Sequence, residues 1–92
     1  MKITEIKIRK VFNDKNRMKA IVSITIDNVL AIHEIKVIQG DKGLFVGMPS
    51  KYANGVFRDI IHPINTKIRK YLEQEIINAY ISKLNEHEVE GE

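Results

Sequence analysis

The sequence has no cysteine and no tryptophan, only two prolines, and no long run of apolar residues. Without cysteine there is no disulfide framework, no thiolate nucleophile and no cysteine-ligated zinc, so nothing in the chain requires an oxidising compartment. The N-terminus MKITEIKIRK alternates charge with isoleucine and lacks the apolar core of a signal peptide. No stretch approaches the roughly 20 apolar residues of a membrane span. These absences predict a cytoplasmic protein that is not inserted in a membrane.

Motifs of enzymatic chemistry are also missing. The chain contains neither a GxxxxGK[ST] nor a GxGxxG phosphate loop. Asp59 and His62 lie three residues apart at the end of a predicted strand, where alternation points them to opposite faces. We therefore expect a structural role for His62, packed beside Pro63 or hydrogen-bonded to a loop carbonyl. The three histidines show no metal-ligand spacing. The sequence predicts a protein that is not an enzyme and that has no cofactor, metal or small-molecule substrate.

Charge is distributed unevenly around a net value of +3. Residues 1–20 carry seven Lys and Arg against two acidic residues, a balance of +5. Residues 51–72 carry five against one, a balance of +4, and residues 73–92 carry one against six, a balance of −5. Clustered positive charge is typical of proteins with a polyanionic partner such as nucleic acid. The same charge pattern also fits a basic surface that only contacts water.

Apolar and polar residues alternate with a period of two through most of the first sixty positions. This pattern predicts half-buried strands, separated by turns rich in Asn, Asp and Gly. In the first strand Ile6, Ile8 and Phe12 are expected to share the buried face. The predicted strands span residues 4–12, 18–26, 29–38, 44–46 and 56–61, and the last two are expected to pair with each other across the Asn54-Gly55 turn.

A single helix is predicted after Pro63, which ends the fifth strand. Asn65 or Thr66 offers an N-cap oxygen, and apolar residues recur at helical spacing to about Leu84. The acidic stretch NEHEVEGE follows and is predicted to be a disordered tail. The predicted fold is therefore α+β: a five-stranded, largely antiparallel sheet followed by one C-terminal helix, in a single domain of residues 1–84 with a tail of residues 85–92.

One helix covers only one face of such a sheet. Ile3, Val11 and Ile21 are expected to place apolar atoms on the other face, and the strand edges remain open. Because a second copy of the chain would bury both, the sequence predicts a homodimer.

The stretch from Ser50 to Arg58 and the start of the helix carry the remaining chemistry. Lys and Arg contact phosphates, an exposed Tyr stacks on a base, and a helix N-terminus attracts an anion. Basic residues in the first helical turn oppose the helix dipole, and a bound phosphate would offset that cost. In a purely structural interpretation Arg58 forms cross-strand pairs and Tyr52 covers the sheet edge. The candidate nucleic-acid-binding residues are Lys51, Tyr52, Arg58, Lys67, Arg69 and Lys70.

Three segments, NRMKAIVSITIDN, IHEIKVIQGDKGLFVGMPSK and FRDIIHPIN, resemble the sporulation stage V protein G (SpoVG) family, small bacterial proteins associated with sporulation, septation and gene regulation. The resemblance spans residues 1 to about 82. It implies a compact α+β fold, a dimer, and DNA binding, in some members also RNA binding, through basic residues near the loop and the helix start. Carried over by position, Lys51 supplies the loop's basic residue and Arg58 that of the strand, while residues 67–70 supply those of the helix.

The chain departs from the family pattern after MPS, where the loop is shorter and Tyr52 stands in place of a second basic residue. A stacking contact is expected to replace a charge contact there. The sequence thus favours a regulatory protein that binds nucleic acid. The alternative is an adaptor that binds a division or envelope protein through the same surfaces, with no nucleic-acid contact.

Overall fold

The described residues of this computed structural model, 1–12 and 15–90, with side chains described up to residue 86, form six strands and one helix. Four strands, β1 (Ile3–Val11), β2 (Met18–Ile26), β3 (Leu30–Gly40) and β4 (Gly43–Gly47), make an antiparallel sheet in sequence order. Strands β5 (Ser50–Ala53) and β6 (Val56–Asp59) form a separate two-stranded ribbon, and α1 (Thr66–Glu90) follows. The α+β class and the single C-terminal helix are confirmed.

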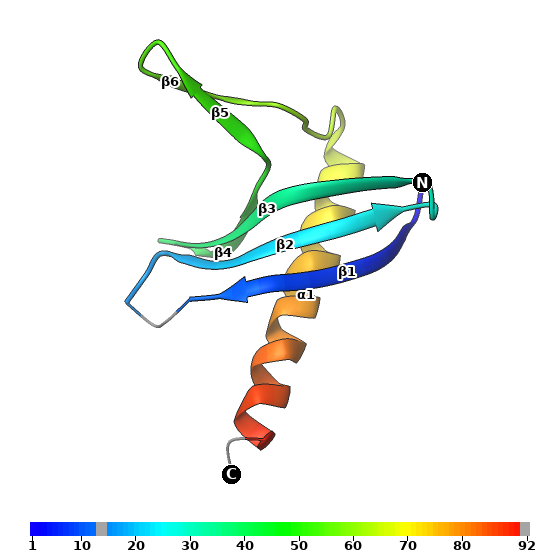
Figure 1. Cartoon of the computed structure of the whole chain (residues 1–92), viewed down its shortest axis with the longest axis vertical. Coiled ribbons are helices and arrows are strands. Elements are labelled where there is room, and N and C mark those ends of the chain that lie inside the picture. Colours follow the sequence, from blue (N-terminus) through cyan, green and yellow to red (C-terminus); the bar gives the residue numbers. More distant parts are fainter. Residues whose placement is uncertain (13–14, 91–92) are drawn as a thin grey trace.

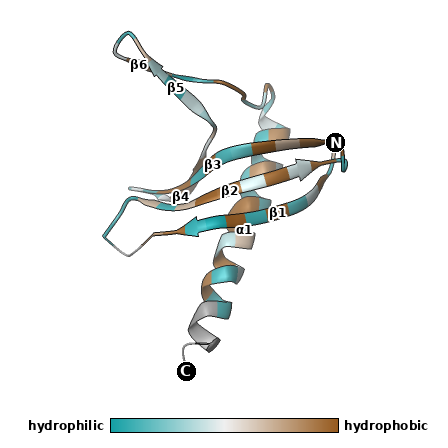
Figure 2. Ribbon diagram, viewed as in Figure 1, coloured by the Kyte–Doolittle hydropathy of each residue, from teal (hydrophilic) through white to brown (hydrophobic). Residues whose placement is uncertain are grey.

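Helix α1 crosses one face of the four-stranded sheet, and its C-terminal half extends past the sheet, while the ribbon projects from the opposite end (Figure 1). The core lies between the sheet and the first half of α1, where the hydrophobic colouring on β2 and β3 is strongest (Figure 2). The even-numbered residues of β2 from Ala20 to Ile26 face the helix, as the alternation predicted, whereas a register shift pairs Met18 with Ile38 on the other face. The buried apolar residues are Ala20, Val22, Ile24, Ile26, Ile32, Ile35, Val37, Val46, Met48, Leu72, Ile76 and Tyr80.

The predicted five-stranded sheet is wrong in one respect, the partner of the last strand. Residues 44–46 pair with β3 through a tight turn at Asp41-Lys42, and β6 pairs with β5, a segment predicted to be loop. The reason lies in Asn54 and Gly55, whose φ angles are 53° and 80°. A two-residue turn with both residues at positive φ joins the residues directly beside it, so Ala53 must pair with Val56.

Two shifts of register in β1 also change which side chains reach the core. The shift between Ile3 and Glu5 turns Ile3 toward the helix, where its N–H donates to the Tyr71 hydroxyl at 3.0 Å. The shift between Ile8 and Lys10 places Lys10 opposite Ile21 on the face away from the helix. Phe12 follows Lys10 onto that face, so the prediction that Phe12 is buried with Ile8 is wrong. A bulge adds one residue and reverses the alternation beyond it.

The start of α1 is as predicted, and its end is not. The Asn65 side-chain oxygen accepts a hydrogen bond from the Ile68 N–H at 2.8 Å, which makes Asn65 the N-cap. The helix continues to Glu90 rather than ending near Leu84. The sequence contains no glycine or proline from Ile64 to Glu90, so nothing in it stops the helix at Leu84. The division at residue 84 remains a prediction, and residues 91–92 of the predicted tail lie outside the described residues.

Candidate nucleic-acid interface

The ribbon has two chemically different faces. Lys51 pairs directly with Arg58, and Tyr52 pairs directly with Phe57. Because successive residues of a strand point to opposite faces, the two cations share one face and the two aromatic rings share the other. The ring centroids of Tyr52 and Phe57 lie 4.9 Å apart with their planes tilted by 56°. We call the side that carries Lys51 and Arg58 the basic face of the ribbon.

Among the described residues, no acidic side chain neutralises the basic face. Neither Lys51 nor Arg58 forms an ion pair with any other residue that the structure describes. Asp59, next to Arg58 in sequence, pairs with Ser50 and therefore points to the aromatic side. All residues from 51 to 62 are exposed. Like charges directly opposite each other in a ribbon repel, so this pair is locally unfavourable unless an anion lies between the two cations.

The helix start forms a second basic cluster, separate from the ribbon. Lys67, Arg69 and Lys70 are all exposed, and the first turn of α1 contains no acidic residue. The tip of the ribbon points away from this end of the helix, and residues 60–65 connect the two (Figure 1). Positive charge at a helix N-terminus costs a few tenths of a kcal/mol per residue, roughly the reverse of the gain from an anion there. The structure thus brings Lys51 and Arg58 together and leaves the helix cations apart from them.

Tyr52 is exposed but does not share a face with Lys51. Its ring packs on Phe57, so a base stacked on Tyr52 lies on the opposite side of the ribbon from the two cations. The stacking role of Tyr52 remains a prediction.

Exposed apolar residues around the ribbon escaped the sequence analysis. Phe57 is 71% exposed, Ile60 70% and Ile64 89%. The Asn54-Gly55 turn could have revealed them in the sequence. A two-residue turn places Phe57 opposite Tyr52 in a hairpin that does not pack on a core. This part of the molecule therefore offers apolar contact area beside its charges.

His62, next to the ribbon, contacts the backbone rather than another side chain. His62 Nδ1 lies 3.2 Å from the carbonyl oxygen of its neighbour Pro63, which is the backbone contact expected of a structural histidine. In the part of the chain that the structure describes, no three His, Asp or Glu side chains lie close enough to hold a metal ion. No helix there is long and apolar enough to cross a membrane.

A four-stranded sheet with one long helix and a projecting, two-faced ribbon defines a small α+β protein whose exposed surface is basic around the ribbon and the helix start. The family model SpoVG matches residues 1–82. The chain belongs to the SpoVG family, as its sequence motifs indicated.

Similar proteins match most or all of the chain. It is 50% identical over 93 aligned positions to "Putative septation protein SpoVG" of Clostridioides difficile (strain 630), with all of both chains covered. The protein of the same name in Clostridium beijerinckii is 48% identical over 92 positions, which cover 99% of this chain and 100% of that one. That of Caldanaerobacter subterraneus is 52% identical over 81 positions, covering 87% and 88%. All three relatives carry the name of a putative septation protein.

Proposed function

We propose that the protein is a non-enzymatic, homodimeric, cytoplasmic regulator of the SpoVG type that binds DNA and RNA in septation or sporulation-like processes. The observation that carries the proposal is the basic face of the ribbon, where Lys51 and Arg58 stand directly opposite each other without an acidic partner among the described residues. A projecting ribbon of this width fits the major groove of a duplex, which admits a two-stranded β-ribbon.

The energetics of the two basic clusters support a phosphate ligand. In the free protein the Lys51–Arg58 pair is repulsive, and the cations at the start of α1 oppose the helix dipole. A phosphate backbone relieves both costs, because each cation gains a counter-charge and the helix N-terminus gains an anion. Contacts to phosphates fix position without reading sequence, so these residues supply affinity rather than a sequence preference.

The aromatic side of the ribbon supports the homodimer. A two-stranded hairpin alone is marginally stable in water, and here its aromatic pair lies exposed with Ile60 and Ile64 close by in sequence. A second copy that covers Phe57 and its neighbours stabilises the ribbon and leaves the basic face open.

The same apolar residues favour a second candidate function, an adaptor that binds a division or envelope protein. In that case Tyr52 and Phe57 contact a different protein, and the nearby positive charge is incidental. Salt dependence separates the two functions, because phosphate contacts release counterions and an apolar interface does not.

The test is fluorescence anisotropy with a labelled random duplex, a random single strand and an RNA, each at two salt concentrations. We expect dissociation constants below about 100 μM at physiological salt, with the logarithm of affinity falling steeply against the logarithm of salt concentration. Absence of binding to all three probes, or affinity that does not change with salt, contradicts the proposal and favours the adaptor.

A further inference from the structure

The face of the four-stranded sheet that α1 leaves uncovered carries a second surface of cations and apolar groups. Its members lie on the side opposite the core because their strand neighbours, such as Ala20, Val22, Val37 and Val46, point into it. Lys10 pairs with Ile21, Ile21 with Lys36, and Ile38 with Phe45, so these side chains share one face. We call this surface the open face; it consists of Lys10, Phe12, Ile21, Lys36, Ile38, Lys42 and Phe45.

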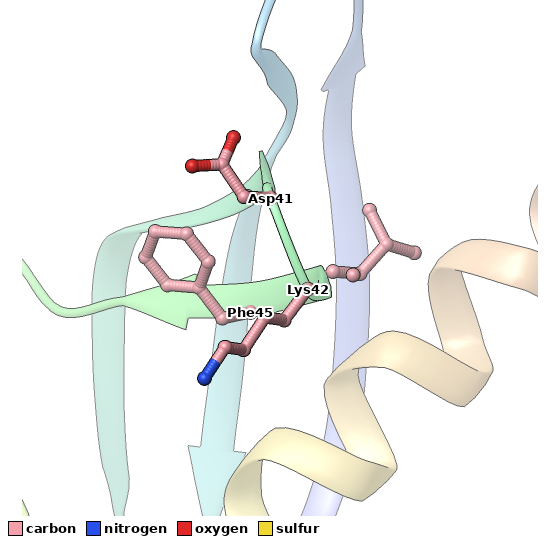
Figure 3. A pocket seen from close by; sticks show the side chains of 6 residues that line it. Asp41, Lys42 and Phe45 are labelled. Carbon is pink, nitrogen blue, oxygen red and sulfur yellow. The ribbon is translucent and has the colours of Figure 1, made fainter.

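The position of the Phe45 ring allows a planar ligand to stack on it. A Cβ atom added to Gly40 would lie 2.9 Å from Cε1 of Phe45, so the ring rests directly against the glycine backbone. The side chain is nevertheless 43% exposed. Figure 3 shows the ring and the Lys42 side chain extending from the β3–β4 hairpin on the side away from the helix. A hollow of about 390 Å³, lined by residues 40–45, adjoins the ring. The ring is thus supported by the backbone and open to a planar ligand.

Three lysines share the open face with this ring. The Lys10 ammonium lies 5.0 Å from the centre of the Phe12 ring, which holds it on the open face. Lys10, Lys36 and Lys42 form no ion pair with another described residue, whereas Lys7 pairs with Glu5 and Arg17 with Asp41. The open face therefore combines at least one accessible aromatic ring with three cations that have no acidic partner in the described part of the chain.

A second copy of the chain is a poor occupant. In a two-fold dimer each patch contacts the same patch on its partner, which here would bring six lysines, three from each copy, into one interface. An acidic polypeptide satisfies the lysines but offers no regular series of planar groups to Phe45. Single-stranded nucleic acid offers both, since its bases stack on aromatic rings and its phosphates contact lysines.

We propose that the open face binds single-stranded nucleic acid, with a base stacked on Phe45 and phosphates held by Lys10, Lys36 and Lys42. The distance from β1 to β4 is three strand spacings, about 14 Å, and a surface of that width takes about two or three nucleotides. This inference shares its ligand class with the proposed function but none of its residues, because the basic face of the ribbon accounts for the duplex contacts.

The experiment measures anisotropy with a labelled oligothymidine, an oligouridine and a random duplex. Phe45→Leu keeps an apolar side chain and removes the stacking ring, so the single-strand dissociation constant is expected to rise at least about fivefold with an unchanged salt slope. Gly40→Ala displaces the ring and is expected to act in the same direction. Lys36→Gln is expected to flatten the single-strand salt slope by about 0.7. Lys83→Gln, on the exposed surface of α1, is the matched control and is expected to change neither.

Three results overturn the inference. The first is unchanged single-strand binding by Phe45→Leu and Lys36→Gln when circular dichroism shows both folded. The second is a shift in molar mass by light scattering for Phe45→Leu, which assigns the open face to a contact between copies. The third is that polyglutamate displaces the labelled single strand as well as an unlabelled single strand of the same total charge does. That result would show a general polyanion site. The duplex probe separates the two proposals. Lys51→Ala is expected to weaken duplex binding by the ribbon, and it leaves the residues of the open face unchanged.

Discussion

At the scale of single residues, Lys51 and Arg58 carry the clearest prediction. If each neutralises one phosphate, replacing either with alanine weakens binding to all duplex sequences alike. The plot of log affinity against log salt concentration is then expected to flatten by about one unit per residue replaced. Anisotropy titrations across a salt series measure that slope.

The control for these variants is Lys83→Ala, which removes one positive charge from an exposed site on α1, away from the ribbon. It has the same effect on net charge but is expected to leave the slope nearly unchanged. A slope that stays at the wild-type value in Lys51→Ala and Arg58→Ala, in protein that circular dichroism shows to be folded, removes the ribbon from the interface.

Asn65 carries a prediction about stability. Its side chain accepts the Ile68 N–H, and loss of an N-cap oxygen costs about 1 kcal/mol. Asn65→Ala is therefore expected to lower the midpoint of urea unfolding without changing the m-value. Thr66→Ala, one position along and already inside the helix, serves as the comparison and should have a much smaller effect. Equal losses for the two variants would show that the cap is not the cause.

At the scale of elements, the alternation of apolar and polar residues predicted where most strands lie. It gave the wrong buried face where a strand contains a register shift. Strand β2 has the predicted bounds of residues 18–26, and its even-numbered residues from Ala20 to Ile26 face the core. In β1 the register shifts turn Ile3 inward and Phe12 outward, and a fixed period of two cannot represent such bulges. The sequence therefore predicted an uncovered face that includes Ile21, but it wrongly assigned Ile3 and Val11 to that face, since they pair with the core residues Ile26 and Ala20.

The ribbon illustrates the same limit for the candidate site. The residue types and the Asn54-Gly55 turn were identified from sequence, but the turn was assigned to connect strands farther away. Once Ala53 pairs with Val56, the register places Lys51 opposite Arg58 and moves Tyr52 to the other side. The strand register decides which residues lie on the same face, and residue types alone do not give that register.

The turn itself is open to test through Gly55, whose φ is +80°. A residue with a Cβ atom is strained there by roughly 1–2 kcal/mol, although an added Cβ would touch nothing closer than the Tyr52 hydroxyl at 4.0 Å. Gly55→Ala is therefore expected to weaken the ribbon, and with it duplex affinity, while the sheet and helix stay folded. Anisotropy and thermal melting by circular dichroism measure the two effects.

The companion variant is Asn54→Gly, which keeps the positive φ at position 54 without strain and should retain duplex affinity. Full duplex affinity in Gly55→Ala would show that the ribbon's register does not matter for binding.

At the scale of the whole molecule, the charges are arranged along its length. The basic face of the ribbon lies at one end, and α1 carries the chain to the other, where the acidic residues from Glu86 onward begin (Figure 1). Because α1 continues as a helix to Glu90, it holds this acidic end away from the ribbon of the same copy. Competition between the acidic residues of α1 near Glu90 and phosphate bound at the ribbon is therefore expected between copies.

The last prediction concerns the homodimer. A chain of 92 residues has a small core and a thin stability margin, and this one leaves Phe57, Ile60 and Ile64 exposed in a single copy. If a second copy covers them, folding and association are linked, and the melting temperature must rise with protein concentration. Phe57→Ser is expected to shift the molar mass from light scattering toward that of a monomer and to lower the melting temperature.

Val29→Ser is the matched control, since Val29 is 84% exposed in the turn between β2 and β3 and lies outside the ribbon. It removes a similar apolar group and should alter neither the molar mass nor its dependence on concentration. A wild-type protein that is folded and monomeric at micromolar concentration, with a melting temperature independent of concentration, contradicts the dimer. The exposed ribbon residues then become free to contact a different protein, which is the arrangement that the adaptor function requires.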